Sequence, residues 1–258
     1  MRIIALIVCL VIIRHIWGAE VSIRLSYSDV EVFPYQMGEG GKIAAPPGIA
    51  VEIIQAAARD IDAKIVLSRY PNKRVQTLLK SGMIDGAFVF SYKDSRKEMG
   101  QYPLINGKLD SSRRIAVMSY YFYVTTNSPV SWNGKALINT SQQVGANMGY
   151  SIVGDLRKIG IVVEEAMNTE QNLRKLVSGR ISAYAAQDFT ADVSLKTLGI
   201  KQVKKLQPPI KTKDYFLIFS HQFVGDHPNL AKQLWTSVGK HRDQVTEASS
   251  HKYFSASK

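Results

Sequence analysis

The segment from Gly149 to Gly154 is the first candidate for chemistry, because Ser151 stands between two glycines. It resembles the Gly-x-Ser-x-Gly turn that exposes a nucleophilic serine, but its second glycine comes one residue too late for that strained turn. The segment Gly38–Gly41 lacks the strand and helix that flank a phosphate-binding glycine loop. The late histidines lack metal-ligand spacing beside carboxylates: His221, His227, His241 and His251. These residues do not predict a catalytic or metal centre.

The first nineteen residues have the pattern of an export signal. A positive start at Arg2 precedes an apolar run over 3–13, which is shorter than the roughly 20 residues that span a bilayer. We expect cleavage near Ala19 and a periplasmic protein; an uncleaved anchor is the alternative. The only cysteine, Cys9, lies in this run. The exported chain would therefore have no thiol for disulfides, catalysis or metal binding.

The chain is basic, with 33 Lys and Arg against 21 Asp and Glu and a formal net charge of +12. Such a balance can indicate nucleic acid, an anionic membrane or an acidic ligand as a partner. The basic residues are scattered in runs of two at most, with no interleaved aromatic platform of the kind that binds single strands. We therefore expect a solvated basic surface and no nucleic-acid partner.

Strands and helices alternate in the first half of the chain. Ile23 and Leu25 alternate with polar residues as in a half-buried strand, and apolar residues later recur at helical spacing. This alternation predicts a mostly parallel sheet with helices on both faces. The expected elements are a strand at 22–27, a helix at 49–61, a strand at 64–68, a helix ending at Gly82 and a strand at 83–90.

The same alternation returns in the second half. In each half a helix that ends on a glycine, Gly82 or Gly179, leads into a buried strand. Extended segments at 113–126 and 215–220 connect the halves. We therefore predict two similar lobes joined by a two-strand hinge, with a ligand cleft between them. The remaining expected elements are strands at 144–148, 161–164 and 181–186 and helices at 151–158, 172–177 and 228–240.

A series of short motifs extends from residue 21 to about residue 241. They are Asp29, Phe33-Pro34-Tyr35, Gly48–Ile54, Tyr70–Arg74, Leu79–Gly86, Ser91–Arg96 and Tyr102-Pro103. In this order they resemble the bacterial extracellular solute-binding proteins of family 3, which are amino-acid-type periplasmic binding proteins. The resemblance implies the α/β type II fold, with mixed, mostly parallel sheets flanked by helices. We place lobe 1 at 20–116 and 213–258, and lobe 2 at 117–212.

The resemblance also implies which residues bind the ligand. Arg96 matches an arginine that grips the ligand's α-carboxylate, because a guanidinium presents a planar fork of donors. Gly149, Tyr150 and Ser151 match the start of a helix, where N–H groups and the helix dipole can hold an anion. Ser91 is expected beside Arg96. The remaining candidates, including the rings expected to lie over the ligand, are Asp29, Phe33, Tyr35 and Tyr70.

The resemblance is imperfect where an acidic residue should accept the ligand's ammonium. Counted from Gly179, Asp188 comes one residue late, and Gln187 occupies the expected place. A bulge in the strand could bring Asp188 back to the ligand. If Gln187 faces the ligand instead, an ammonium would have no counter-ion, and small carboxylates other than free amino acids become possible ligands. Ser182 also replaces an aspartate that is usual earlier in this strand. The long charged segment at 104–114 is either a surface flap or a specificity element.

We predict a binding protein and not an enzyme. It would close on a small polar solute, an amino acid or a related carboxylate, and deliver it to a membrane transporter of the ABC type. One alternative is a sensory module that presents its ligand to a receptor. Another is a dehydratase-type enzyme on the same fold, with Glu52, Asp29 or Glu31 as its acid or base. No cofactor or metal is expected, and the protein should be a monomer.

Overall fold

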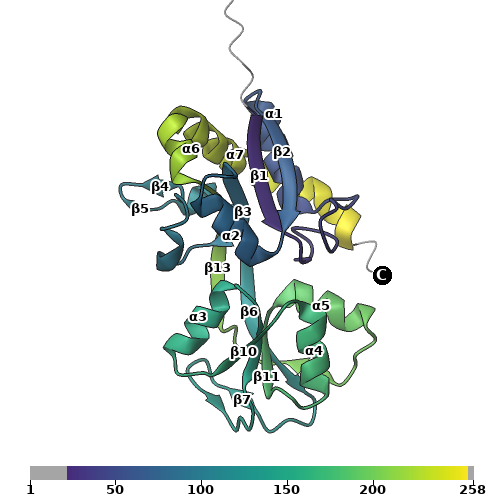
Figure 1. Cartoon of the computed structure of the whole chain (residues 1–258). Coiled ribbons are helices and arrows are strands. Elements are labelled where there is room, and N and C mark those ends of the chain that lie inside the picture. Colours follow the sequence, from purple (N-terminus) through teal and green to yellow (C-terminus); the bar gives the residue numbers. More distant parts are fainter. Residues whose placement is uncertain (1–21, 255–258) are drawn as a thin grey trace, which may run out of the picture.

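The computed structural model describes residues 22–254, so the predicted signal peptide lies outside the described residues. The chain forms an upper lobe 1 and a lower lobe 2 (Figure 1). Two long strands, β6 (Ala116–Thr125) and β13 (Lys211–Phe219), run between the lobes. They are antiparallel neighbours, paired from Lys211 opposite Tyr120 to Tyr215 opposite Ala116. They form the predicted two-strand hinge.

Lobe 1 contains a mixed sheet in the order β13-β3-β1-β2. Strand β1 is parallel to β2 and β3, whereas β13 is antiparallel to β3. The elements are β1 (Ser22–Ser28), α1 (Ile49–Asp60), β2 (Lys64–Tyr70), α2 (Asn72–Lys80), β3 (Gly86–Ser91), the 3-10 turns η1 (Asp94–Arg96) and η2 (Ser111–Arg113), β4 (Leu104–Ile105), β5 (Lys108–Leu109), α6 (His221–Asp226) and α7 (Pro228–Phe254).

The two faces of this sheet bury alternate residues of the same strands. In β13, Leu217 and Phe219 belong to the core under α1 and α7, whereas Phe216 and Ile218 pack with α2. This is the period-two alternation of a strand covered on both faces. The sheet therefore holds β13 firmly at one end, while its other end crosses to lobe 2.

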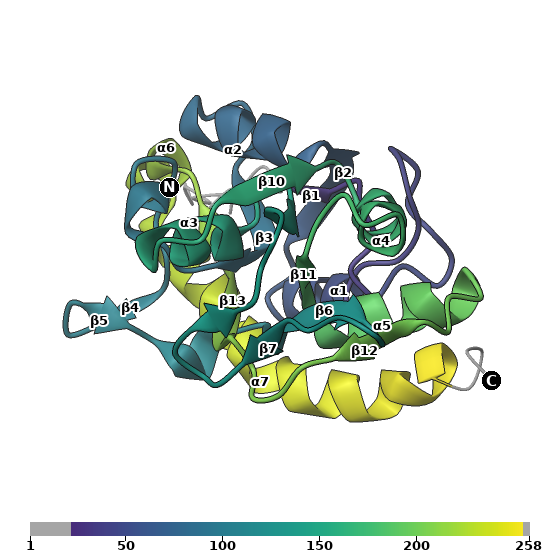
Figure 2. The same cartoon turned by 90° about the horizontal axis from the view of Figure 1, so that it is seen from below.

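Lobe 2 repeats this plan with the strand order β10-β9-β11-β6, and β12 also pairs with β6. Helix α3 packs on one face of the sheet, and α4 and α5 pack on the other. Figure 2 shows this lobe from below, with β6 and β13 again side by side. Its elements are β7 (Ser131–Trp132), β8 (Leu137–Ile138), β9 (Val144–Asn147), α3 (Ser151–Lys158), β10 (Val163–Ala166), α4 (Thr169–Val177), β11 (Ala183–Gln187), α5 (Asp188–Thr197) and β12 (Val203–Lys205).

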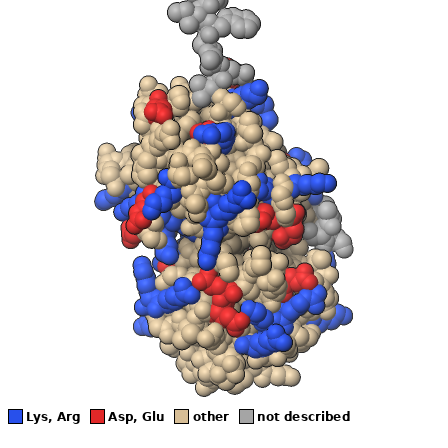
Figure 3. All heavy atoms as spheres, in the orientation of Figure 1, with Lys and Arg blue, Asp and Glu red and all other residues tan. Residues whose placement is uncertain are grey.

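The surface carries positive and negative side chains together. Figure 3 shows Lys and Arg spread over both lobes with Asp and Glu among them, so this face has no large field of one sign. The first part of the segment at 104–114 forms the small β4–β5 hairpin, on which Leu104 and Ile105 are exposed, and the turn η2 follows it. Among the described helices, none is both long enough and apolar enough to cross a membrane.

Gly48 joins the start of α1 to the end of α7. Its N–H donates to the hydroxyl of Tyr253 at 2.8 Å, and that hydroxyl donates to Glu52 at 2.7 Å. The backbone of Gly48 has a φ of 111° and a ψ of 148°, a conformation open almost only to glycine. A Cβ at this position would lie 2.5 Å from the carbonyl oxygen of Tyr35.

We therefore expect Gly48→Ala to lower the free energy of unfolding by at least about 2 kcal/mol, from backbone strain and from displacement of the Tyr35 carbonyl. Gly179→Ala is the matched control, because Gly179 also has a positive φ of 70° but open space around it. The control should cost about 1 kcal/mol. Urea unfolding measures both values; equal losses would show that the contact at Gly48 is unimportant.

Candidate functional site

A cavity of about 30 Å³ lies where the two lobes meet the hinge. Lobe 1 contributes the ends of β1 and β3 and the turn η1, and lobe 2 contributes the start of α3 and the end of β11. The hinge strands supply one tyrosine each. The lining residues are Ser28, Val32, Gln36, Asn72, Phe88, Val89, Phe90, Ser91, Arg96, Tyr120, Tyr150, Ser151, Gln187 and Tyr215.

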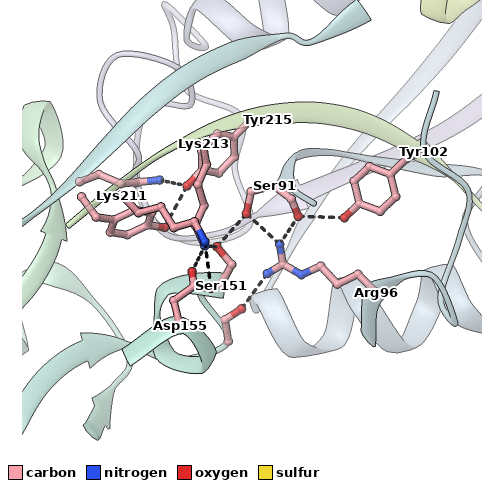
Figure 4. A network of polar contacts seen from close by, with 11 residues as sticks. Ser91, Arg96, Tyr102, Ser151, Asp155, Lys211, Lys213 and Tyr215 are labelled. Atoms are coloured by element: carbon pink, nitrogen blue, oxygen red, sulfur yellow. Dashed lines mark hydrogen bonds and ion pairs between the residues drawn. The ribbon is translucent and has the colours of Figure 1, made fainter. Parts of the chain in front are cut away.

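Arg96 reaches across the boundary between the lobes. One nitrogen of its guanidinium, Nη1, donates to the backbone carbonyl of Ser91 at 2.8 Å, and Nη2 donates to the carbonyl of Gly149 in lobe 2 at 3.0 Å (Figure 4). The guanidinium also lies 5.0 Å from the centre of the Phe90 ring. The residue is only 6% exposed, and among the described residues it forms no ion pair. Carbonyl oxygens therefore hold a buried cation that lacks a carboxylate.

A second cation lies behind Ser151. The Ser151 hydroxyl accepts hydrogen bonds from Lys213 Nζ and from the Ser91 hydroxyl, both at 2.7 Å. Lys213 also forms an ion pair with Asp155 of α3, and its side chain is 8% exposed. Burial lowers the pKa of Lys213, although Asp155 acts in the opposite direction. Two positive groups thus approach the start of α3 from the lobe 1 side and from the hinge (Figure 4).

The opposite wall of the cavity is polar and uncharged. Tyr215 donates its hydroxyl proton to Tyr120 at 2.9 Å, and Gln187 Nε2 donates to Tyr215 at 2.9 Å. Burial raises the pKa of both tyrosines, so they remain neutral hydroxyls at physiological pH. The buried Gln187 Oε1 and Tyr150 Oη atoms have no hydrogen-bond partner of normal geometry among the described residues. Such atoms indicate spare capacity for a polar ligand.

A bulge shapes the end of β3. The register between β3 and β13 shifts so that Phe88 and Phe90 face adjacent residues of β13, which leaves Val89 as the additional residue. Val89 has a φ of 62°, which is rare for a β-branched side chain. Bulges redirect the side chains that follow them. Here the bulge directly precedes Ser91 and the turn that carries Arg96.

The structure brings four of the ten predicted residues to the cavity: Ser91, Arg96, Tyr150 and Ser151. Two crevices flank the cavity, and Tyr150 lines all three spaces. Gly149 lines a crevice of about 210 Å³ together with Lys93 and Arg157. Asp29 lines the other crevice, of about 180 Å³, together with Glu39. Gly149 and Asp29 therefore lie at the margins of the site.

The three predicted ligand-covering rings lie elsewhere. Phe33 is a core residue whose ring packs edge-on against Phe254 at 5.3 Å. The Tyr35 hydroxyl donates to the carbonyl of Val117 at 3.4 Å, and Tyr70 lies under the guanidinium of Arg74. These rings stabilise lobe 1, and the aromatic lining of the cavity comes from other residues: Phe88, Phe90, Tyr120, Tyr150 and Tyr215.

Asp188 does not line the cavity, and Gln187 takes the position expected for an acid. Strand β11 pairs with β6 without interruption up to Gln187 opposite Tyr120. The bulge that would have moved Asp188 into the site is therefore absent from this strand. Asp188 begins α5, where its carboxylate accepts from the N–H of Phe189 at 2.9 Å, and burial raises its pKa. The site consequently has a carboxamide in place of a carboxylate.

Sequence reasoning missed Lys213, Tyr215 and Tyr120 as site residues. It identified the strands that carry them only as a hinge. One sequence feature could have linked two of them. Lys213 and Tyr215 are two residues apart in a strand, so their side chains lie on the same face of β13. The contact of Lys213 with Asp155 joins residues 58 apart in the chain, and no local pattern predicts it.

No protein-family model matches the sequence, and no curated protein matches it either. Many solved structures do match. The GluR0 ligand-binding core from Nostoc punctiforme in complex with L-glutamate has a TM-score of 0.69 at 13% identity, covering 90% of this chain and 99% of that one. An arginine-, lysine- and histidine-binding protein from Geobacillus stearothermophilus has a TM-score of 0.71 at 16% identity, covering 91% and 96%. A histidine kinase sensor domain similar to periplasmic binding proteins has a TM-score of 0.72 at 14% identity, covering 90% and 95%.

These likenesses extend over nearly the whole described chain and over nearly the whole of each neighbour. They confirm the predicted fold class, the two-lobed α/β fold of type II periplasmic binding proteins. At 13–16% identity they show the fold alone. What this chain binds must be argued from its own cavity.

We expect Asp155→Asn to lower the free energy of unfolding by roughly 1–3 kcal/mol, because it leaves the buried Lys213 ammonium without its counter-ion. Glu98→Gln is the control, since the Lys80–Glu98 pair is well exposed on both sides and should contribute less than about 1 kcal/mol. Urea unfolding of both variants tests this. A loss at Asp155 no larger than at Glu98 would contradict the structural role of the Lys213 pair.

Proposed function

We propose that this protein binds a small carboxylate-bearing solute between its lobes and releases it unchanged. One observation carries the proposal: the guanidinium of Arg96 crosses the boundary between the lobes and has no acidic partner among the described residues. A buried arginine of this kind suits a carboxylate, which can accept two parallel hydrogen bonds from the guanidinium. The start of α3, at Ser151, would add hydrogen-bond donors and the positive end of its dipole.

The lobes must open before a ligand can enter. A cavity of about 30 Å³ has room for about one or two water molecules. Direct bonds also close the boundary, from Arg96 to the Gly149 carbonyl and between the hydroxyls of Ser91 and Ser151. We propose that rotation about β6 and β13 opens the site, with the lobe boundaries at 116–117 and 212–213. The ligand would then replace the interlobe bonds and shift the equilibrium towards the closed form.

Transport and sensing are two uses of such a clamp. The exported location inferred from residues 1–19 supports delivery of the solute to a membrane transporter. The likeness to the substrate binding protein of an amino acid ABC transporter supports the same role. The likeness to a histidine kinase sensor domain favours a second candidate, a module that reports its bound ligand to a membrane receptor. The two roles use the same binding step and differ in the partner.

The cavity supports binding more than catalysis. None of its lining residues is Asp, Glu or His, so no lining side chain is a ready general base. Glu52, a candidate for a dehydratase, is engaged outside the cavity by hydrogen bonds from Ser249, Lys252 and Tyr253. Glu31 accepts from the N–H of Gly38 at 2.7 Å. We therefore expect the ligand to be recovered intact after binding.

Arg96→Ala should weaken binding of any carboxylate ligand at least tenfold, because one charge-assisted hydrogen bond contributes roughly 1.5–3 kcal/mol. Ligands would first be found by a thermal-shift screen of the protein without residues 1–19, and their affinities then measured by calorimetry. Arg74→Ala is the matched control, because Arg74 lies over Tyr70 and does not line the cavity. Unchanged affinity in Arg96→Ala would remove Arg96 from the site, and consumption of the ligand would favour an enzyme.

A further inference from the structure

We infer that the ligand carries a hydroxyl or oxo group, and not an ammonium, on the carbon next to its carboxylate; this inference rests on the function proposed above. The inference concerns the polar wall formed by Gln187, Tyr120 and Tyr215. Binding of a carboxylate by Arg96 does not by itself give this wall a role. Two features of the cavity support the inference: its lining contains no acidic side chain, and the hydrogen-bonding groups of its polar wall are neutral.

The charge around the cavity is positive. Arg96 is the only charged residue in the lining, and Lys213 lies directly behind Ser151. The acid bonded to Lys213 is Asp155, which is already neutralised by that lysine. A ligand carboxylate would neutralise Arg96. An added ammonium would then lie in a buried space without a counter-ion, which is an unfavourable arrangement.

The lining residues indicate which groups the next ligand atom meets. If the carboxylate is held by Arg96 and the start of α3, a substituent on the neighbouring carbon has to face the remaining polar wall. There Gln187 Nε2 is occupied by Tyr215, whose proton is donated to Tyr120. The fully buried atoms without a hydrogen-bond partner there are Gln187 Oε1, an acceptor, and the Tyr150 hydroxyl, and the Tyr120 hydroxyl keeps its own proton to donate.

These leftover atoms match a neutral substituent. A ligand hydroxyl can donate to Gln187 Oε1 and accept from Tyr150, and an oxo group can accept from Tyr150. An ammonium has three protons to donate and cannot accept a hydrogen bond. The oxygens of this wall are neutral, so they could accept those protons but could not balance the charge of the ammonium, and a buried charge without a counter-ion is costly.

Two acids without an ion pair among the described residues line an adjoining crevice. Asp29 and Glu39 line the crevice that shares Asn72 and Tyr150 with the cavity, and Glu39 accepts from the N–H of Glu31 at 3.1 Å. A cationic group at the distant end of a longer ligand could reach that crevice.

The test uses matched ligand pairs that differ only in this substituent, measured by calorimetry on the protein without residues 1–19. Suitable pairs are lactate and alanine, malate and aspartate, and 2-oxoglutarate and glutamate. We expect at least one hydroxy or oxo acid to bind at least tenfold more tightly than its ammonium counterpart. Arg96→Ala should abolish binding of that acid.

Gln187→Glu should reduce the preference at least tenfold, because it places a carboxylate where the ammonium would lie. Gln142→Glu is the control, since it makes the same charge change on an exposed residue outside the cavity. The ratio of the two affinities within each pair, measured on the wild-type protein, tests the inference even if Gln187→Glu does not fold. An amino acid that binds as tightly as its counterpart, with dependence on Arg96, would overturn this inference and leave the proposed function standing. Absence of binding by both members of every pair would overturn both.

Discussion

A buried guanidinium without a carboxylate is the constraint on which the rest of this structure depends. Arg96 is nearly inaccessible to solvent, and carbonyl oxygens from both lobes, those of Ser91 and Gly149, satisfy part of its hydrogen-bonding capacity. Dipoles stabilise a buried cation less well than an anion does, so this arrangement favours an incoming negative charge. Because one of the two carbonyls belongs to lobe 2, the ligand and the closure of the lobes become coupled through one side chain.

The hinge strands have two roles. They connect the lobes, and their side chains also form part of the cavity, with Tyr120 from β6 and Tyr215 from β13. Lys213, on the same face of β13 as Tyr215, holds Ser151 and Asp155 at the start of α3. A rotation about the hinge therefore changes the site directly, because the groups that would contact the ligand lie on the moving strands. No further residues are therefore needed to couple ligand binding to closure of the lobes.

The sequence predicted the alternating strands and helices well, because each buries an apolar face whose period is visible locally. It missed α5 because few residues of that helix are buried, and it ended α7 at residue 240 although the helix continues to Phe254. That extension depends on contacts of Ser249 and Tyr253 with Glu52, about 200 residues earlier. The site residues also divide into those set by local sequence and those set by long-range contacts. Arg96 and Ser151 could be predicted from local motifs, whereas Lys213 and the tyrosine wall depend on how the lobes meet.

On binding, the ligand's carboxylate has to take over the interlobe contact that the Gly149 carbonyl now makes with Arg96. The most direct measurement is a crystal structure of the protein with a tightly bound carboxylate. We expect both carboxylate oxygens within about 3 Å of the Arg96 guanidinium nitrogens. A carboxylate bound elsewhere, with Arg96 still donating to Gly149, would contradict the central claim.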